Sequence, residues 1–267
     1  SRLSAQHFNQ QYADSIAEKD VYDLQWKKEL FISLPVAGLF VGNLFIEPQV
    51  LLAEELDELD IKDVPWFERN IIFFDSTTAA QSALMSDYFN KASVVVGLVS
   101  VLSAYKVPKE IPVNFILYVE GLYISSGLTD LLKKSVGRIR PYAYNVNYSD
   151  DYRIRGGAAQ SFPSGHTSSS SFNCFFAAKM IDDYLIDDES KLLKTINWTV
   201  AALVPAWVGY LRMEAGVHFL TDVVAGYTIG ATCGMLIPEL HKLNNDTISF
   251  YPINFQEYTG ISCMIRF

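Results

Sequence analysis

The chain has 267 residues, of which 50% are hydrophobic and 19% are charged, and its formal net charge is -9. This length fits one large domain or two small ones, and the charged share lies below the roughly 25% of an ordinary soluble domain. The acidic balance argues against nucleic acid as the main partner. The three cysteines lack the spacing of a disulfide framework or a zinc site, so we interpret them as apolar packing residues: Cys174, Cys233 and Cys263.

Six apolar stretches follow one another along the chain. Each is too long for an ordinary strand, so the sequence predicts six helices. A span of seventeen helical residues covers about 26 Å, close to the ~30 Å of a hydrocarbon core. We therefore expect an all-α bundle of six transmembrane helices; the alternative is a soluble bundle with a very apolar core. The stretches are 30–46, 92–105, 111–129, 167–181, 195–211 and 223–238.

The regions around these stretches divide the chain into three parts. Residues 1–29 are a polar N-terminal segment, 30–242 form the helical domain, and 243–267 are a C-terminal tail. The tail is rich in β-branched and aromatic residues, which predicts one or two short strands. Glu120 and Lys179 lie inside two of the apolar stretches, where charges are costly and usually functional or snorkelling.

Charge placement predicts an orientation for six spans. The connection 47–91 holds ten acidic and three basic residues, whereas the short turn 106–110 on the side of the termini carries Lys106 and Lys109. This agrees with termini on the cytoplasmic side, although the acidic connection 182–194 fits less well. In this topology the connections after the third and fifth spans share the outer face.

The first motif is "KKSVGRIRP", with Lys133 seven residues before Arg140. A phosphoryl group in transfer spreads negative charge over three oxygens, which guanidinium forks and an ammonium group match. Arg212, farther along the chain, is the third cation that we assign to phosphate binding. The alternative is a basic cluster that flanks a membrane helix, since Lys134 and Arg138 lie in the same segment.

The second motif is "PSGH", from Pro163 to His166. Its turn leads into a Ser/Thr run that favours a helix start, and the free amides of a helix N-terminus bind anions. Ser164 and Gly165 are therefore assigned to phosphate binding, because glycine lets the backbone approach the ligand closely. His166 can protonate a leaving alkoxide. The alternative is a helix cap beside a surface histidine.

The third motif is "RMEAGVHFLTD", in which His218 and Asp222 are four residues apart. On one helix they share a face. A carboxylate on one imidazole nitrogen fixes the tautomer and makes the other nitrogen more nucleophilic, so we assign His218 as a nucleophile toward phosphorus. The alternative is an exposed pair of little energy. All three motifs fall in the two connections that the topology places on one face.

The remaining histidines, His7 and His241, are predicted to lie at the surface. No HExxH pattern, Cys/His cluster or glycine-rich nucleotide loop occurs in the sequence. We therefore expect no metal ion and no cofactor.

Together these motifs resemble the type 2 phosphatidic acid phosphatase superfamily, whose pattern is K-x6-RP, then PSGH, then SR-x5-H-x3-D. Every charged position matches, and Leu211 stands where the family usually has serine. The resemblance covers residues 111–238. It implies a bundle of six core helices and hydrolysis of phosphoesters without a metal ion.

The resemblance also implies roles for the residues. His218 corresponds to a nucleophile that forms a phosphohistidine, Asp222 to the group that orients it, and His166 to the general acid. Residues that correspond to the phosphate cradle are Lys133, Arg140, Ser164, Gly165 and Arg212.

We expect an integral membrane phosphatase that acts on a lipid phosphate, in a bacterial inner membrane with its site on the periplasmic face. The family suggests isoprenyl pyrophosphate, phosphatidylglycerol phosphate, phosphatidate and lipid A phosphate as substrates, and the sequence does not rank them. The alternatives are a soluble periplasmic acid phosphatase with the same site and an oxidoreductase similar to the vanadium haloperoxidases. The sequence does not indicate an oligomeric state.

Overall fold

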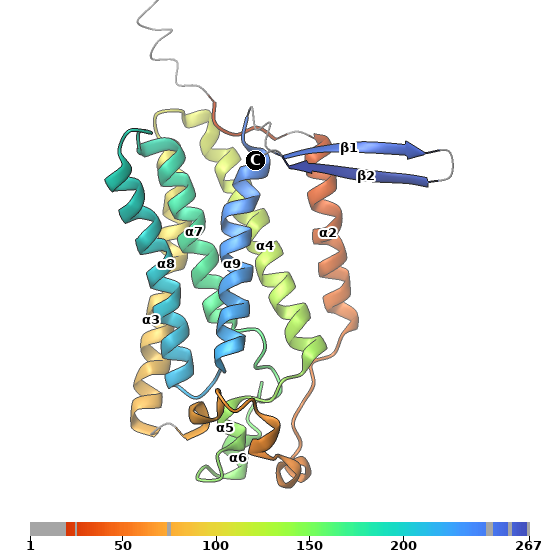
Figure 1. Ribbon diagram of the computed structural model, residues 1–267, viewed down its shortest axis with the longest axis vertical. Coiled ribbons are helices and arrows are strands. Elements are labelled where there is room, and N and C mark those ends of the chain that lie inside the picture. Colours follow the sequence, from red (N-terminus) through yellow and green to blue (C-terminus); the bar gives the residue numbers. More distant parts are fainter. Residues whose placement is uncertain (1–19, 25, 74–75, 244–247, 256–257, 266–267) are drawn as a thin grey trace, which may run out of the picture.

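Six long helices packed side by side dominate the part of the chain that the computed structural model describes, which is residues 20–243 except 25 and 74–75, with 248–255 and 258–265 (Figure 1). Consecutive long helices run in opposite directions. The predicted all-α fold is confirmed, because each of the six apolar stretches lies mostly within one long helix. These helices are α2 (Trp26–Phe45), α3 (Ser76–Ser100), α4 (Ile111–Val136), α7 (Gly165–Leu185), α8 (Lys191–Glu214) and α9 (Leu220–His241).

The helix α3 begins far earlier than the apolar stretch 92–105 predicted. In its first four turns the buried positions Ala79, Ser82 and Ser86 follow a helical spacing and carry small side chains, whereas Leu84 and Tyr88 are exposed. A search for long apolar runs misses such turns, because their inward face is built from small residues that pack close to neighbouring helices. The connection after α2 is therefore shorter than 47–91, and Asp87 belongs to a bundle helix.

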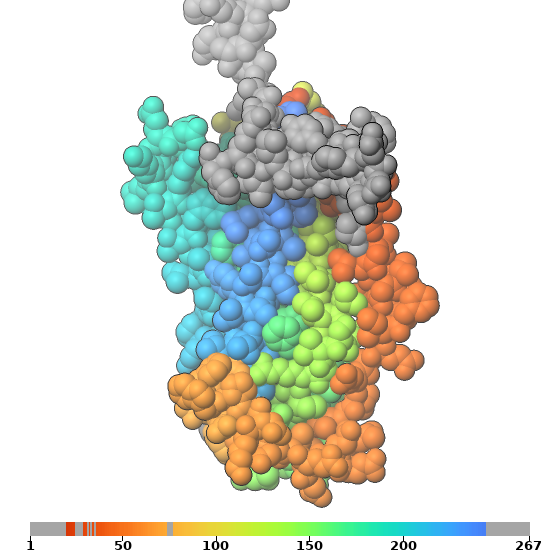
Figure 2. Space-filling view, turned by 45° about the vertical axis from the view of Figure 1, so that its right-hand side comes forward, coloured from red at the N-terminus to blue at the C-terminus, as the bar shows by residue number. Residues whose placement is uncertain are grey.

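Short elements fill the connections. The segment after α2 holds the 3-10 helices η1 (Ala53–Glu58), η2 (Ile61–Asp63) and η3 (Arg69–Phe73). Between α3 and α4 lie η4 (Val101–Ala104) and η5 (Pro108–Glu110), and between α4 and α7 lie the single turns α5 (Pro141–Tyr144) and α6 (Asp150–Arg153). Figure 2 shows the orange segment after α2 covering one end of the bundle.

The central helix is α7, which packs against α3, α4, α8 and α9. Its residues Phe172, Phe176 and Met180 are fully buried and form an apolar core with Leu117 and Tyr118 of α4. Because α7 is enclosed by the other helices, its N-terminus is held rigidly at the end of the bundle where the motif-bearing connections lie.

A row of glycines brings α9 onto α7. A Cβ atom at Gly230 would lie 2.1 Å from the backbone oxygen of Ser168, and Gly226 and Gly234 approach the α7 backbone in the same way. Only a residue without a side chain permits this approach. The contact places the start of α9, which follows His218, beside the start of α7, which carries the "PSGH" motif.

The outer surface of the bundle is apolar. Within the part of the chain that the structure describes, two segments are long and apolar enough to cross a membrane, Pro108–Tyr144 and Leu220–His241, fewer than the six predicted spans. Large apolar side chains nevertheless point outward on the other helices as well, and such patches mark a membrane or partner surface. Examples are Leu34, Phe40 and Leu44 of α2, Val95 and Val99 of α3, and Leu203 of α8.

The tail forms an antiparallel hairpin of β1 (Ile248–Phe255) and β2 (Tyr258–Ile265), in register from Ile248 opposite Ile265 to Phe255 opposite Tyr258. The prediction of one or two short strands in the tail is confirmed, and there are two in the described residues. At the other limit of the helical domain, α2 begins before residue 30. The rest of the predicted N-terminal segment 1–29, including His7, lies largely outside the described residues.

Candidate active site

The three motifs meet at one end of the bundle. Lys133 lies in the last turn of α4, and the connection 137–164 folds under the helices. His166 lies in the first turn of α7, and His218 lies in the turn between α8 and α9. The prediction that the third and fifth connections share one face is confirmed. All eight residues assigned from the sequence lie in this region.

His218 is almost fully buried, with 1% of its surface exposed. Its Nδ1 atom lies 2.7 Å from the backbone oxygen of Ser161 and 3.6 Å from Oδ2 of Asp222. A carbonyl can only accept, so Nδ1 carries the proton and donates it to Ser161. The Nε2 atom of a neutral His218 therefore presents a lone pair, as a nucleophile requires.

The environment of His218 opposes a second proton on the ring. Burial lowers the pKa of His218 well below 6.5, and the positive charges of Arg140, Lys133 and Arg212 lower it further, while the hydrogen-bonding partner Asp222 acts in the opposite direction. His218 is consequently neutral at physiological pH. The charges of all three predicted cations thus act on this histidine, although each cation comes from a different segment.

Asp222 is held by donors on several sides. Its Oδ2 accepts hydrogen bonds from the Ser161 hydroxyl at 2.5 Å and from the backbone N–H of Phe219 at 2.8 Å. Its Oδ1 accepts from the guanidinium of Arg138 at 2.5 Å. The carboxylate thus caps α9 and anchors Ser161, whose carbonyl orients His218. The sequence interpretation had Asp222 alone hold the tautomer, and the structure adds the Ser161 carbonyl as the nearer partner.

Arg138 and Glu68 form a support that the sequence analysis missed. Arg138 also donates to Oε2 of the fully buried Glu68 at 2.7 Å, and its guanidinium lies over the ring of Phe219. Glu68 accepts from the backbone N–H of Thr221 at 2.8 Å. Sequence spacing had placed Arg138 in a flanking basic cluster. No local signal links it to Glu68, which lies seventy residues earlier in the chain.

Two of the cations that the sequence assigns to phosphate binding are bonded to neutral groups. Lys133 donates from Nζ to the backbone oxygens of Gln160 at 3.2 Å and Pro163 at 2.5 Å. Arg140 donates to the backbone oxygens of Gly157 at 2.9 Å and Gln160 at 3.3 Å. Because these acceptors carry no net charge, the positive field of both side chains stays available to an anion.

Arg212 has an unsatisfied donor. Its Nη1 lies 3.1 Å from Oγ of Ser86 and 3.5 Å from Oδ1 of Asp87, whereas its buried Nε has no hydrogen-bond partner within the described residues. A buried donor without a partner costs free energy, roughly 1–3 kcal/mol. An anionic oxygen would satisfy it, and this supports the assignment of Arg212 to phosphate binding.

The "PSGH" segment forms the N-terminus of α7, with Ser164 as its N-cap. The backbone N–H of Ser164 donates to the backbone oxygen of Asp222 at 2.9 Å, which ties this turn to the third motif. A Cβ atom on Gly165 would lie 3.5 Å from Cε of Lys133. The first amides of α7, which have no intrahelical acceptor, therefore begin beside the Lys133 ammonium.

His166 is paired with a residue that was not predicted. Its Nε2 lies 2.8 Å from Oδ1 of Asp87 on α3. Burial and the charge of Arg212 lower the pKa of His166 to about 4, while Asp87 acts to raise it. The sequence analysis counted Asp87 among ten acidic residues of a connection. Only the early start of α3 turns it toward the site.

The fold thus brings the three motifs together, and all three lie in the part of the chain that matches a known protein family. Residues 114–246 match the PAP2 superfamily, and this range includes all three motifs. The chain belongs to this superfamily. The resemblance noted from the sequence is therefore confirmed.

Similar proteins include phospholipid phosphatase 1 of Rattus norvegicus, with 29% identity over 44% of this chain and 48% of that protein. Lipid A 1-phosphatase of Rhizobium johnstonii is 33% identical over 41% of this chain and 40% of that protein. The matches thus span less than half the length of these relatives. A crystal structure described as the first transmembrane PAP2 type phosphatidylglycerolphosphate phosphatase from Bacillus subtilis aligns with a TM-score of 0.41 and 18% identity, covering 78% of this chain and 90% of that one.

Proposed function

We propose that this protein hydrolyses a phosphoric ester or diphosphate on a lipid through a phosphohistidine at Nε2 of His218. The observation that carries the proposal is the state of His218. Its Nδ1 donates to a carbonyl, its Nε2 carries a lone pair, and the positive charges of three cations act on the ring. A neutral imidazole in a positive pocket attracts a phosphate anion and can attack its phosphorus atom.

The reaction then proceeds in two displacements. In the first, the Nε2 lone pair of His218 attacks phosphorus, the bond to the leaving oxygen breaks, and that oxygen takes a proton from His166. In the second, a water molecule gives its proton to His166 and attacks phosphorus. The P–N bond breaks, phosphate leaves, and His218 is neutral again.

The residues divide the work of charge stabilisation. Lys133, Arg140 and Arg212 balance the charge on the phosphoryl oxygens. The backbone N–H of Gly165 at the start of α7 and the hydroxyl of Ser164 add further donors. His166 can act as the acid although its pKa is low in the free protein, because a bound phosphate dianion favours its protonated form. With this charge set the transfer needs no metal ion.

A lipid substrate and a membrane location agree with the apolar outer surface of the bundle. The similarity to proteins named phospholipid phosphatase and lipid A 1-phosphatase supports the same choice. We propose that the apolar stretches 30–46, 92–105, 111–129, 167–181, 195–211 and 223–238 lie in the bilayer. The site then opens on the periplasmic face of a bacterial inner membrane, opposite the basic turn 106–110.

The test is phosphate release by detergent-purified protein from a panel of lipid and water-soluble phosphates, with His218→Ala measured alongside. We expect turnover of a lipid phosphate by the wild type and a loss of about 10⁴-fold or more in the variant, as for removal of a nucleophile. Wild-type activity retained in the variant would refute the phosphohistidine. Activity on small soluble esters alone would favour the periplasmic acid phosphatase.

Two reagents test the transition state and the absence of a metal ion in the proposed reaction. Vanadate, which mimics five-coordinate phosphorus, should inhibit the protein competitively. Chelation by EDTA should leave initial rates unchanged, and a large loss would contradict a metal-free transfer. Oxidation of bromide in the presence of vanadate and peroxide would instead favour the haloperoxidase-like alternative.

A further inference from the structure

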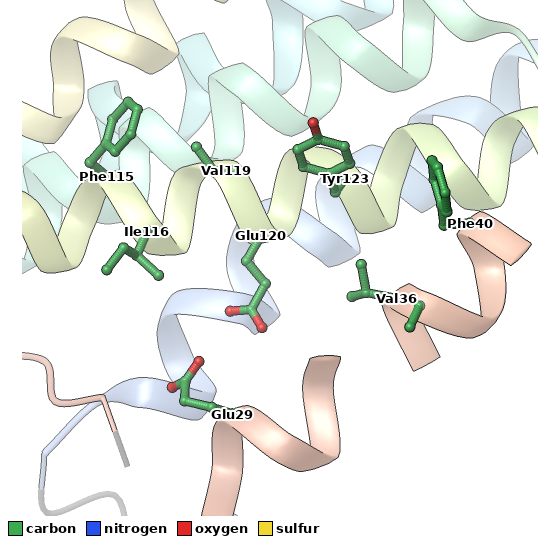
Figure 3. Close-up of a pocket in the computed structure, with 9 residues that line it drawn as sticks. Glu29, Val36, Phe40, Phe115, Ile116, Val119, Glu120 and Tyr123 are labelled. Atoms are coloured by element: carbon green, nitrogen blue, oxygen red, sulfur yellow. The ribbon is translucent and has the colours of Figure 1, made fainter. Parts of the chain in front are cut away.

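We propose that Glu29, Glu120 and His241 form a binding site for a divalent cation of the zinc class. They come from α2, α4 and α9, at the end of the bundle opposite His218. One possible ligand atom from each side chain lies within 4.8 Å of the others. Figure 3 shows the Glu29 and Glu120 carboxylates pointing toward each other. The proposed phosphatase reaction does not use these residues, so the two proposals are independent.

The hydrogen bond of His241 to the backbone determines which of its ring nitrogens can ligate a metal ion. Its Nδ1 lies 2.8 Å from the backbone oxygen of Ile237 and must donate a proton to it. In the neutral ring Nε2 then carries a lone pair, and this atom faces Oε1 of Glu29 at 3.0 Å and Oε2 of Glu120 at 3.6 Å. Three electron-rich atoms face one another, so a positive charge is needed among them.

The spacing of these atoms fits a metal ion. Zinc bonds of about 2.0–2.1 Å to nitrogen and oxygen at tetrahedral angles place ligand atoms about 3.3–3.4 Å apart. The distances from Nε2 of His241, 3.0 and 3.6 Å, lie on either side of that value. The bond from Nδ1 to the carbonyl of Ile237 is the outer partner that commonly orients a ligating histidine.

Burial adds a second, independent reason. His241 is fully buried, so its predicted surface position is wrong, and the side chain of Glu120 is 10% exposed. The Oε2 atom of Glu120 is enclosed and has no hydrogen-bond partner among the described residues. An unpartnered carboxylate oxygen in such a place is costly. Two carboxylates and a neutral imidazole carry two negative charges, which a divalent cation balances.

The chemistry of the donors favours zinc over magnesium or calcium. An imidazole nitrogen with two carboxylates suits a transition metal, whereas the hard cations prefer oxygen ligands alone. The three side chains leave the fourth position of a tetrahedral ion open, and Glu29 and Glu120 line a groove of about 530 Å³ between α2 and α4 whose other walls are mainly apolar. Because α2 packs mainly on α4, the ion would fasten α2 to both α4 and α9.

The experiment is calorimetric titration of zinc chloride into the untagged full chain after removal of metals by a chelator. We expect one zinc ion per chain, and at least tenfold weaker binding in Glu120→Gln and in Glu29→Gln. These variants keep the shape of the side chain and are chosen because His241→Ala could fail to fold. X-ray absorption of the zinc-loaded protein should show a nitrogen and oxygen shell near 2.0–2.1 Å with an imidazole.

His166→Ala serves as the control, because it removes a histidine at the catalytic end and should leave the binding of zinc unchanged. Loss of zinc binding in that variant would overturn the proposal. It would also be overturned by the absence of stoichiometric binding in the wild type, which would mean that a proton shared by His241 and Glu29 supplies the charge. Equal affinity in the wild type and Glu120→Gln would refute it as well.

Discussion

Lysines at the two ends of the bundle are held by different kinds of partner. At the catalytic end, Lys133 donates to backbone carbonyls and meets no carboxylate within salt-bridge distance in the described residues. At the opposite end, Lys179 lies 2.8 Å from Asp183 and 2.7 Å from Glu239. The positive charge of a cation that is bonded to neutral acceptors is not neutralised and can attract an anionic ligand. The charge of a cation between carboxylates is neutralised by them, and this ion pairing stabilises the fold. The partners of a buried lysine thus separate a binding role from a structural one.

The sharpest way to break this comparison is to replace each lysine with methionine. Lys133→Met should lower kcat/KM about 10²–10³-fold, as for loss of one transition-state donor, with little change in thermal midpoint. Lys179→Met should leave kcat/KM of the folded protein unchanged and destabilise it by about 1–3 kcal/mol, because the buried carboxylate of Asp183 loses one of its two cations and keeps Lys242. Phosphate release and thermal unfolding in detergent measure both effects.

The comparison fails if the two variants behave alike. A loss of activity in Lys179→Met without loss of folded protein would mean that the far end takes part in catalysis. Unfolding of Lys133→Met would mean that its carbonyl contacts hold the connection 137–164 together.

A second prediction concerns the support of His218. Asp222→Asn should lower kcat about 10²-fold, less than the ~10⁴-fold known for loss of the correct histidine tautomer. The reason is that the Ser161 carbonyl still accepts the Nδ1 proton of His218. Single-turnover kinetics would measure the phosphorylation step directly.

Ser161→Ala is the matched variant for that experiment, since it removes the hydroxyl bonded to Asp222 and keeps the carbonyl. We expect a loss of about tenfold, the size of one hydrogen bond to a charged group. If Asp222→Asn lowers kcat about 10⁴-fold or more, the Asp222 carboxylate rather than the Ser161 carbonyl fixes the tautomer of His218.

The third prediction concerns pH. The pKa of His166 is about 4, and the nearby Asp87 carboxylate acts to raise it. Asp87→Asn should therefore lower the pKa of His166 to a value below about 4. Less His166 is then protonated at neutral pH, and the alkaline limb of kcat/KM moves to lower pH. We expect about a tenfold loss at pH 7, for a pKa change of about one unit, and similar rates for the two proteins under acidic conditions. A uniform loss at all pH values would instead mean that Asp87 only positions the ring.

The smallest effect is expected at the close contact between α7 and α9, in the middle of the bundle. Gly230→Ala places a methyl group against the α7 backbone and should destabilise the protein by about 1–3 kcal/mol. Gly38→Ala on α2 is the control, because a Cβ atom there meets nothing within 4 Å and alanine is the better helix former. Thermal midpoints in detergent compare the two, and equal loss in both would remove the close contact as the explanation.

Much of the fold could be predicted from the sequence because apolar runs of helical length determine which segments are buried or face a bilayer. The six helices and the shared end of the motif-bearing connections follow from that pattern, and the strands of the tail follow from its β-branched and aromatic residues. The start of α3 at Ser76 could not, because its inward face is built of small polar and apolar residues rather than a continuous apolar run.

The candidate site divides in the same way. Lys133, Arg140, His166, Arg212, His218 and Asp222 are recognisable because phosphate chemistry demands those residue types at those spacings. The sequence by itself therefore determined the reactive groups. Only the tertiary structure decided their partners: Glu68, Asp87 and the Ser161 carbonyl come from distant segments, and the burial of His241 depends on helices far apart in the chain. A hydrogen bond across such separations leaves no periodic signal, because it is set by how whole helices pack.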